Sequence, residues 1–202
     1  MKACIYGAGA IGGWIGVRLA QAGCTVSVVA RNATLQALQS HGLRLASGEQ
    51  TETVPVQASA DPADLGVQDL VVIAVKAPAM ADVARAIAPR LGPETMVLTA
   101  MNGVPWWFFE GFGGQWQGTR LQAVDPDGQI AKAVPAHHII GCVVHASFAL
   151  RSPGYVQHQF GNKLIIGEPS GRKTGRVQAL AALLERAGHE VALSEQIQKD
   201  AW

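Results

Sequence analysis

Six residues near the N-terminus, Gly7-Ala8-Gly9-Ala10-Ile11-Gly12, match the pattern G-x-G-x-x-G. The pattern follows a short apolar run and opens a stretch with helical periodicity, which is the context in which it binds a dinucleotide. The first glycine permits a tight turn, the second lets the backbone approach a diphosphate, and the third lets the helix pack on the strand. Backbone N–H groups at the positive end of the helix dipole then hold the diphosphate. The alternative is a glycine-rich turn without a ligand.

The residue after the second predicted strand indicates which of the two nicotinamide dinucleotides the chain would bind. That strand ends Val28-Val29-Ala30 and is followed by Arg31, where an NAD-binding domain usually carries an acid for the ribose hydroxyls. A guanidinium can pair bidentately with a 2′-phosphate. The sequence therefore favours NADP(H) over NAD(H), the alternative being a solvated surface arginine.

Two further polar residues follow predicted strands. Lys76 comes directly after the apolar run 69–75, and Asn102 follows the run 95–100. Ligands of open parallel sheets lie beyond the carboxyl ends of the strands, where an amide suits a ribose hydroxyl or a substrate carbonyl. Each residue alone is as well explained as a solvated lysine or a turn former. Together with the glycine loop and Arg31, they place polar groups at four strand ends.

The elements that must position these residues alternate along the first half of the chain. Strands are predicted at 3–6, 25–30, 43–46, 51–56, 69–75 and 95–100, and helices at 10–22, 33–40 and 80–91. The segment 43–56 contains a hairpin, and the apolar run 69–75 is typical of a central strand covered on both faces. This α/β pattern predicts a Rossmann-like, doubly wound parallel sheet.

The second half predicts an antiparallel extension of that sheet. After an irregular segment, 104–138, strands are expected at 139–150, 155–159 and 164–166, with turns at Pro153-Gly154 and Gly161-Asn162. A helix at 177–185, a strand at 190–193 and a helix N-capped by Ser194 follow. A helix that short is not stable alone, and nothing follows it in the chain. We therefore expect an NADP-binding domain at 1–193 and, at 194–202, the first turns of an all-helical substrate domain that is mostly missing.

Composition excludes several classes of function. Apolar residues make up 49% of the chain, and 16 Lys and Arg balance 15 Asp and Glu, so no global field recruits nucleic acid or an acidic membrane. No uncharged apolar run is long enough for a membrane span, and the N-terminus does not resemble a signal peptide. The three cysteines, Cys4, Cys24 and Cys142, show no zinc-site spacing and indicate buried thiols in a reducing cytoplasm. We expect a cytoplasmic protein without a metal.

These motifs together resemble the ketopantoate reductase (2-dehydropantoate 2-reductase) family. The resemblance is carried by the glycine loop, Arg31, Val75-Lys76-Ala77 and Asn102-Gly103. It extends over the whole chain through a later set of motifs: Gly141 to Ser147, Pro153-Gly154, His158, Gly161, Ile165 to Glu168, and Ile197 to Trp202. The stretch from Asn102 to Trp107 is similar to a bacterial subgroup of that family.

The resemblance implies NADPH-dependent reduction of a 2-keto acid to a 2-hydroxy acid, 2-dehydropantoate to pantoate in pantothenate and coenzyme A biosynthesis. It assigns the diphosphate to Gly7–Gly12 and the 2′-phosphate to Arg31. Lys76 and Asn102 would lie on the nicotinamide side, with Asn102 also facing the substrate, and the Ser147 backbone would touch the cofactor. The partner is then a small-molecule 2-keto acid, and a homodimer remains an option.

The proton donor of the family is a lysine two residues after the tryptophan that matches Trp202, so it does not occur in this chain. We therefore expect residues 1–202 to bind cofactor and largely not to catalyse, since a positioned general acid contributes about 10²–10⁴ in rate.

Two other functions and several residue roles stay open. The first alternative is an NADP-dependent dehydrogenase of the 6-phosphogluconate-like superfamily acting on another acid or imine. The second is a module that senses NADP(H) without chemistry. His145 and His158 are either acids near a keto group or structural histidines. We expect the cluster Trp106–Phe109 to pack in the core, the alternatives being a cap on the nicotinamide pocket or a contact with the missing domain. His189 ends a helix, where the dipole favours a cation.

Overall fold

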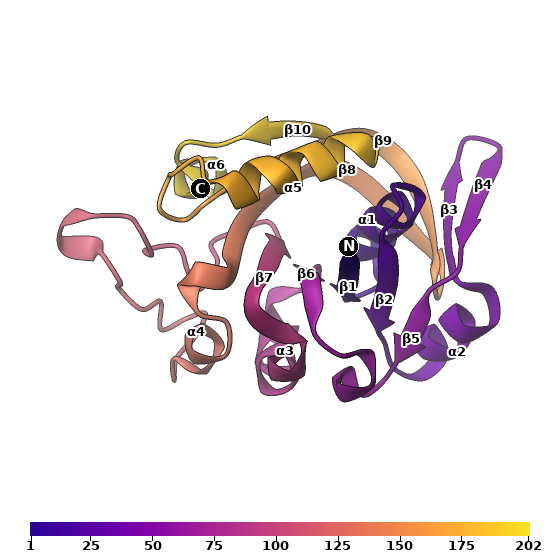
Figure 1. The fold of residues 1–202 in the computed structure, drawn as a ribbon, viewed down its shortest axis with the longest axis horizontal. Coiled ribbons are helices and arrows are strands. Elements are labelled where there is room, and N and C mark those ends of the chain that lie inside the picture. Colours follow the sequence, from indigo (N-terminus) through magenta and orange to yellow (C-terminus); the bar gives the residue numbers. More distant parts are fainter.

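One curled sheet of ten strands runs through the computed structural model, which describes residues 1–202 (Figure 1). Its strands lie in the order β4-β3-β9-β8-β7-β6-β1-β2-β5, and β10 pairs with β9. The strands are β1 (Lys2–Tyr6), β2 (Thr25–Val29), β3 (Leu43–Ser47), β4 (Gln50–Val54), β5 (Gln57–Ser59), β6 (Gln68–Ile73), β7 (Leu91–Ala100), β8 (Ile139–Ser152), β9 (Tyr155–Gly167) and β10 (Glu190–Leu193). The helices are α1 (Ala10–Gln21), α2 (Asn32–His41), α3 (Met80–Ala86), α4 (Gln129–Ala133), α5 (Gly175–Arg186) and α6 (Ile197–Ala201).

The parallel half of the sheet has the predicted Rossmann-like arrangement. Strands β5, β2, β1, β6, β7 and β8 are neighbours in that order and all pair in parallel. This is the order 3-2-1-4-5-6 of dinucleotide-binding domains once the β3–β4 hairpin is set aside. Four successive residues of β6, from Leu70 to Ile73, are fully buried because helices cover both faces. Their continuous apolar character is the signal that the sequence carried.

The antiparallel extension differs from the prediction in one respect. β8 and β9 form a long antiparallel pair, and the outer edge of β9 pairs in parallel with β3 and β10. The predicted turn at Gly161-Asn162 is wrong, because β9 continues through it. His145 pairs with Lys163 and Ala146 with Gly161, so Asn162 is the extra residue of a bulge. Gly161 has φ +76°, which a bulge tolerates as readily as a turn.

The predicted helix 80–91 is also too long. α3 ends at Ala86, a 3-10 turn occupies Ala88–Arg90, and Leu91 already belongs to β7. Pro89 lacks a backbone N–H and disfavours helical geometry at the residue before it. The apolar periodicity that continued to Leu91 therefore reflects burial of a strand.

Two hydrophobic cores lie on the two faces of the sheet. In Figure 1, α5 lies inside the curl of the sheet, beneath β10, and α3 and α4 lie at the bottom, on the outer side of the curl. The first core joins α1 and α5 to the sheet through residues such as Trp14 and Leu180. The second joins α3 and α4 to the other face, with Met80, Ile130 and Trp107 among its members. No helix of the chain combines the length and the apolar character needed to cross a bilayer.

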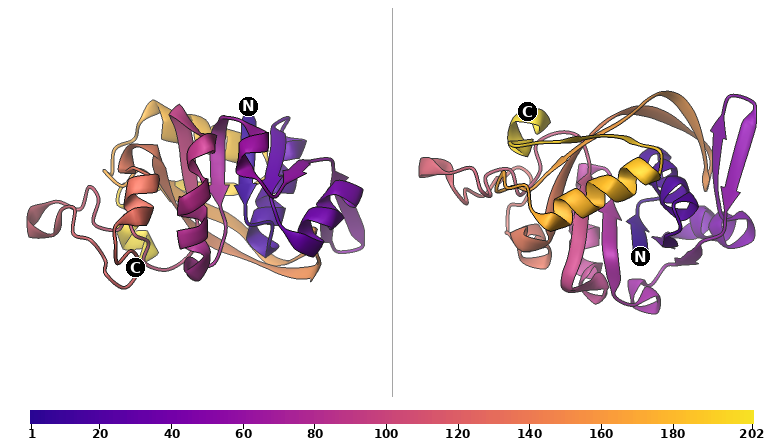
Figure 2. Two further views of the ribbon diagram at one scale, coloured as in Figure 1. Left: turned by 90° about the horizontal axis from the view of Figure 1, so that it is seen from below. Right: turned by 45° about the horizontal axis from the view of Figure 1, so that its top comes forward.

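The irregular segment between β7 and α4 extends away from the sheet (Figure 2). At its beginning, Trp106, Trp107 and Phe108 are buried, and the Trp107 indole donates to Thr99 Oγ1 at 3.2 Å. The prediction that this aromatic cluster packs in the core is confirmed for these three residues. Farther along, Phe112 and Trp116 are exposed.

The short helix α6 packs against the sheet that precedes it. Ile197 is fully buried, and its side chain occupies the space above Gly141 and Gly167 that a Cβ atom there would fill. Gln198 Nε2 donates to the carbonyl oxygens of Glu110 and Pro169 at 2.8 and 2.6 Å. The predicted cap at Ser194 is wrong, because its hydroxyl accepts from Gln196 N outside the helix, whose N-cap is Gln196. Residues after 193 thus find packing partners within the chain.

His189 is buried against the first core, although its place at a helix end led us to expect a position that favours a cation. It is 4% exposed, and its ring meets the Trp14 indole edge-on at 4.6 Å between centroids. Neither ring nitrogen has a hydrogen-bond partner. Burial, with a smaller effect of the nearby Arg18 charge, lowers the pKa of His189 to about 4.

This buried imidazole is expected to make the fold acid-sensitive. The unfolded chain takes up a proton on His189 near pH 6.5 and the folded chain only near pH 4, so its contribution is complete above pH 6.5 and is lost as the pH falls. At pH 5 the loss in the free energy of unfolding is about 2 kcal/mol. Urea denaturation at pH 7 and pH 5 checks this, with His189→Phe as the control that lacks the proton site. An equal loss in both proteins would contradict the assignment.

Candidate functional site

The fold explains two of the three glycines in the loop Gly7–Gly12, and the third has no such explanation. Gly7 has φ +92°, and a Cβ atom there would lie 2.9 Å from the Ala74 carbonyl oxygen. A Cβ atom at Gly12 would lie 2.0 Å from the Gly7 carbonyl oxygen. The fold therefore requires glycine at both positions. Gly9 has φ −75°, and a Cβ atom there would meet nothing within 4 Å. Its missing side chain leaves open space above the loop, as the close approach of a ligand requires.

The loop opens α1, and the N-terminus of this helix is uncapped. Gly9 is the N-cap and supplies no side-chain acceptor, and the first turn carries no acidic residue. The first N–H groups of a helix have no partner within it, and the helix dipole adds partial positive charge there. Ala10 and Ile11, which begin the helix, therefore present donors suited to an anion such as a diphosphate.

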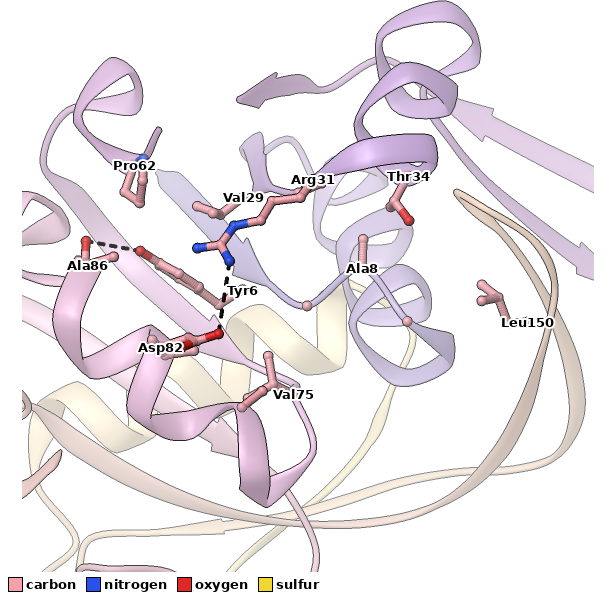
Figure 3. A pocket seen from close by; sticks show the side chains of 15 residues that line it. Tyr6, Ala8, Val29, Arg31, Thr34, Pro62, Val75, Asp82, Ala86 and Leu150 are labelled. Atoms are coloured by element: carbon pink, nitrogen blue, oxygen red, sulfur yellow. Dashed lines mark hydrogen bonds and ion pairs between the residues drawn. The ribbon is translucent and has the colours of Figure 1, made fainter. Parts of the chain in front are cut away.

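Two adjoining cavities meet at this loop. The first, of about 310 Å³, is lined by Tyr6, Gly7, Ala8, Gly9, Val29, Ala30, Arg31, Thr34, Pro62, Val75, Ala79, Asp82, Val83, Ala86 and Leu150 (Figure 3). The second, of about 630 Å³, is lined by Gly7, Gly9, Ala10, Ile11, Ala74, Val75, Lys76, Ala77, Ala100, Met101, Asn102, Val144 and Ala146. Both cavities include Gly7, Gly9 and Val75 in their walls. Together they form an elongated cleft at the carboxyl ends of the parallel strands, a shape that suits a ligand with two halves joined by an anion.

Arg31 reaches into the first cavity from the end of β2. Its guanidinium is 63% exposed and lies 3.9 Å from an Asp82 carboxylate oxygen, which belongs to α3 on the opposite wall (Figure 3). Asp82 also pairs with Arg85, one turn farther along α3. The Tyr6 hydroxyl, between these walls, donates to the Ala86 carbonyl oxygen at 3.1 Å. Sequence reasoning missed Asp82, since no local pattern shows that α3 faces the end of β2.

Lys76 and Asn102 both lie in the second cavity, as their strand ends predicted. Lys76 is exposed and forms none of the ion pairs of the structure. The Asn102 amide is held by the neighbouring strand: Nδ2 donates to the Val144 carbonyl oxygen at 3.0 Å, and Oδ1 accepts from Val144 N at 2.9 Å. One N–H and one lone pair of this amide remain for a ligand. Asn102 thus combines a structural bond with a fixed orientation in the cleft.

Three residues of the β8–β9 pair lie outside the cavity walls. Ser147 donates from its hydroxyl to Gln159 at 2.8 Å, whereas its neighbour Ala146 lines the second cavity. His145 is exposed on β8, and His158 bonds the Gly161 carbonyl oxygen at 2.8 Å. Of the candidate residues, the cleft therefore brings together Arg31, Lys76, Asn102 and the loop from Gly7 to Ile11, with Gly12 packed beneath it.

The cysteines take no part in this cleft. Cys4, Cys24 and Cys142 are free and buried, as predicted. Burial raises the pKa of the Cys4 thiol to about 11 and that of Cys142 to about 12. Thiols that stay protonated at neutral pH are poor nucleophiles and ligands.

Comparison with known proteins identifies the family to which the chain is related. The family model for "Ketopantoate reductase PanE/ApbA" matches residues 3–107. A 2-dehydropantoate 2-reductase of Mesorhizobium japonicum is 44% identical over 203 aligned residues, which cover 100% of this chain and 62% of that protein. A protein of Ralstonia solanacearum MolK2, provisionally named a ketopantoate reductase, has a crystal structure 56% identical in sequence with a TM-score of 0.96. That match covers 99% of this chain and 62% of the other.

A more distant structure shares the fold alone. It is a D-mandelate dehydrogenase solved with NADH and anilino(oxo)acetate, at 23% identity and a TM-score of 0.77, covering 96% of this chain and 57% of that one. The chain spans about 60% of the length of the curated relatives that it matches. The matched residues 3–107 contain the glycine loop, Arg31, Lys76 and Asn102, and this chain belongs to the ketopantoate reductase PanE/ApbA family.

Proposed function

We propose that the cleft binds NADP(H) and that the whole protein uses it to reduce a 2-keto acid, 2-dehydropantoate to pantoate. The open space at Gly9 is the observation that carries this proposal. The backbone there is extended and free of neighbours, so the fold gives no reason for a glycine. A diphosphate over the uncapped start of α1 gives one.

The chain's own residues would divide the binding of this cofactor between the two cavities. Loop amides from Gly7 to Gly12 would hold the diphosphate, and the Arg31 guanidinium would pair with the 2′-phosphate. Lys76 and Asn102 would face the nicotinamide half, which supplies a hydride when bound. The Lys76 ammonium, free of a carboxylate partner, would attract an anionic keto acid, and the fixed Asn102 amide would bond a ribose hydroxyl or the substrate oxygen. The backbone of Ser147 would contact the cofactor from β8.

Residues 1–193 would then form the cofactor domain of a cytoplasmic enzyme, with 194–202 at the start of a helical substrate domain. Homology to the longer reductases supports this, since about 40% of the length of each of those proteins lies outside the match. The lysine expected as proton donor belongs to that further part, so we expect residues 1–202 alone to bind cofactor without turnover. NADPH oxidation by the full-length protein with 2-dehydropantoate tests the substrate. Turnover with other keto acids only would confine the family name to the fold.

Fluorescence titration of residues 1–202 with NADPH and NADH tests the cofactor. NADPH is expected to bind more tightly, and Arg31→Ala to weaken NADPH by about 10- to 100-fold, the loss of a charge-assisted contact of about 1.5–3 kcal/mol, with little effect on NADH. Arg172→Ala, which removes an exposed arginine outside the cleft, is the matched control and should leave both affinities unchanged. Equal affinity of the wild type for both dinucleotides would remove the 2′-phosphate assignment.

A further inference from the structure

The first cavity contains a carboxylate, although the sequence has no acidic residue directly after the second strand. No acid follows β2, but Asp82 of α3 reaches the same space from the opposite wall, 3.9 Å from the Arg31 guanidinium (Figure 3). Both residues line the cavity beside the glycine loop. A ribose held near Arg31 therefore lies between a cation and an anion.

The fold itself makes little use of the Asp82 carboxylate. Its side chain is 53% exposed, and its ion-pair partners, Arg31 and Arg85, are 63% and 71% exposed. Exposed pairs of this kind contribute about 0–1 kcal/mol to stability. The charge of Asp82 is thus free to act on whatever occupies the cavity.

We propose that Asp82 is a specificity-determining residue for the 2′ position of the adenosine ribose. Its carboxylate accepts a hydrogen bond from a 2′-hydroxyl and repels a 2′-phosphate, whereas Arg31 attracts the phosphate. The inference rests on the proposed dinucleotide site and refines it: the preference for NADP(H) is moderated, and NAD(H) remains a usable ligand. The acid that other NAD-binding domains place after β2 is supplied here from α3.

Arg85 sets the strength of this effect. It pairs with the same carboxylate from one turn farther along α3 and is not part of the wall of the first cavity. When a phosphate occupies Arg31, Asp82 keeps Arg85 as its partner, so its charge is partly compensated. Arg85→Gln leaves that charge uncompensated and is expected to weaken binding of a 2′-phosphate further.

Two ligands that differ only in the 2′-phosphate, 2′,5′-ADP and 5′-ADP, test the proposal by calorimetry on residues 1–202. In Asp82→Asn the affinity for 2′,5′-ADP is expected to rise about tenfold, because a carboxylate that faces the phosphate dianion across the cavity is removed. The affinity for 5′-ADP should stay the same or fall about twofold with the loss of one acceptor. The gain for 2′,5′-ADP should shrink as the salt concentration approaches 1 M, where the Debye length is about 3 Å.

Glu94→Gln is the matched control, since it removes an exposed carboxylate near the beginning of β7, outside both cavities. It should leave the ratio of the two affinities unchanged. An equal change, or none, in both affinities of Asp82→Asn would overturn the role of Asp82 and leave the nucleotide site in place. Failure of the wild type to bind either ligand would instead remove the proposed cofactor site, and the inference with it. Urea denaturation of each variant verifies that the fold is retained.

Discussion

Gly9→Ala is expected to fold as the wild type does and to bind NADPH about 10- to 100-fold more weakly, the cost of one charge-assisted hydrogen bond. A Cβ atom at this position meets nothing in the protein within 4 Å, and the backbone has φ −75°, which any residue adopts. The added methyl group instead occupies the space through which a diphosphate would approach the loop amides. Fluorescence titration measures the affinity, and the free energy of unfolding should change by less than about 1 kcal/mol.

Gly175→Ala is the matched control for that experiment. Gly175 begins α5 as Gly9 precedes α1, and a Cβ atom there also meets nothing within 4 Å. The two variants thus add the same methyl group at the start of two different helices, and only the one at the loop should affect NADPH. Equal affinity of Gly9→Ala and wild type would place the diphosphate elsewhere.

Arg176→Met is expected to lower the free energy of unfolding by about 3–5 kcal/mol, because it leaves a buried carboxylate without its cationic partner. The Arg176 guanidinium forms two parallel hydrogen bonds with Glu168, of 2.7 and 2.5 Å, and the Glu168 side chain is 5% exposed. The same guanidinium donates to the carbonyl oxygens of His137, in the turn before β8, and of Ile139, the first residue of β8. Removing it therefore loosens the junction between α5 and the sheet as well.

Lys173→Met serves as the comparison for an exposed pair. Lys173 lies 2.8 Å from Glu195, with side-chain exposures of 49% and 78%, and its loss should cost about 0–1 kcal/mol. The double variant Glu168→Gln/Arg176→Met should recover part of the loss, since no buried charge is left unpaired. Urea denaturation measures all three proteins. A loss below about 1 kcal/mol in Arg176→Met would show that water compensates Glu168 in full.

The parallel half of the fold could be predicted because its signals are local. An apolar run such as 69–75 needs cover on both faces, and the residues of the run alone are enough to show this. The bulge at Gly161 could not be distinguished from a turn, because a glycine with positive φ serves both, and only the partner strand β8 decides between them. Pro89 carried a usable signal, since a proline ends a helix, but the apolar periodicity beyond it favoured a longer one.

For the cleft, the sequence predicted which residues follow the strands but not what those residues face. Asn102 was expected at the strand end, and its bonds to Val144 depend on β7 and β8 being neighbours, which no local pattern encodes. Asp82 lies in a helix whose orientation toward Arg31 comes from packing alone. His189 was expected to suit a cation because the local sequence shows only that it follows a helix. Its burial against Trp14 of α1 joins segments far apart in the chain, and no local pattern encodes that contact.

The strand β8 borders both halves of the cleft and so sets the length of a ligand that can occupy both. Val144 lies in the wall of the second cavity and Leu150, six residues later on the same strand, in the wall of the first. At about 3.3 Å per residue these positions are at most about 20 Å apart. Because one hydrogen-bonded strand sets this separation, the distance between the two cavities is fixed. A mononucleotide can fill one end only, and a molecule must span the whole interval to engage both.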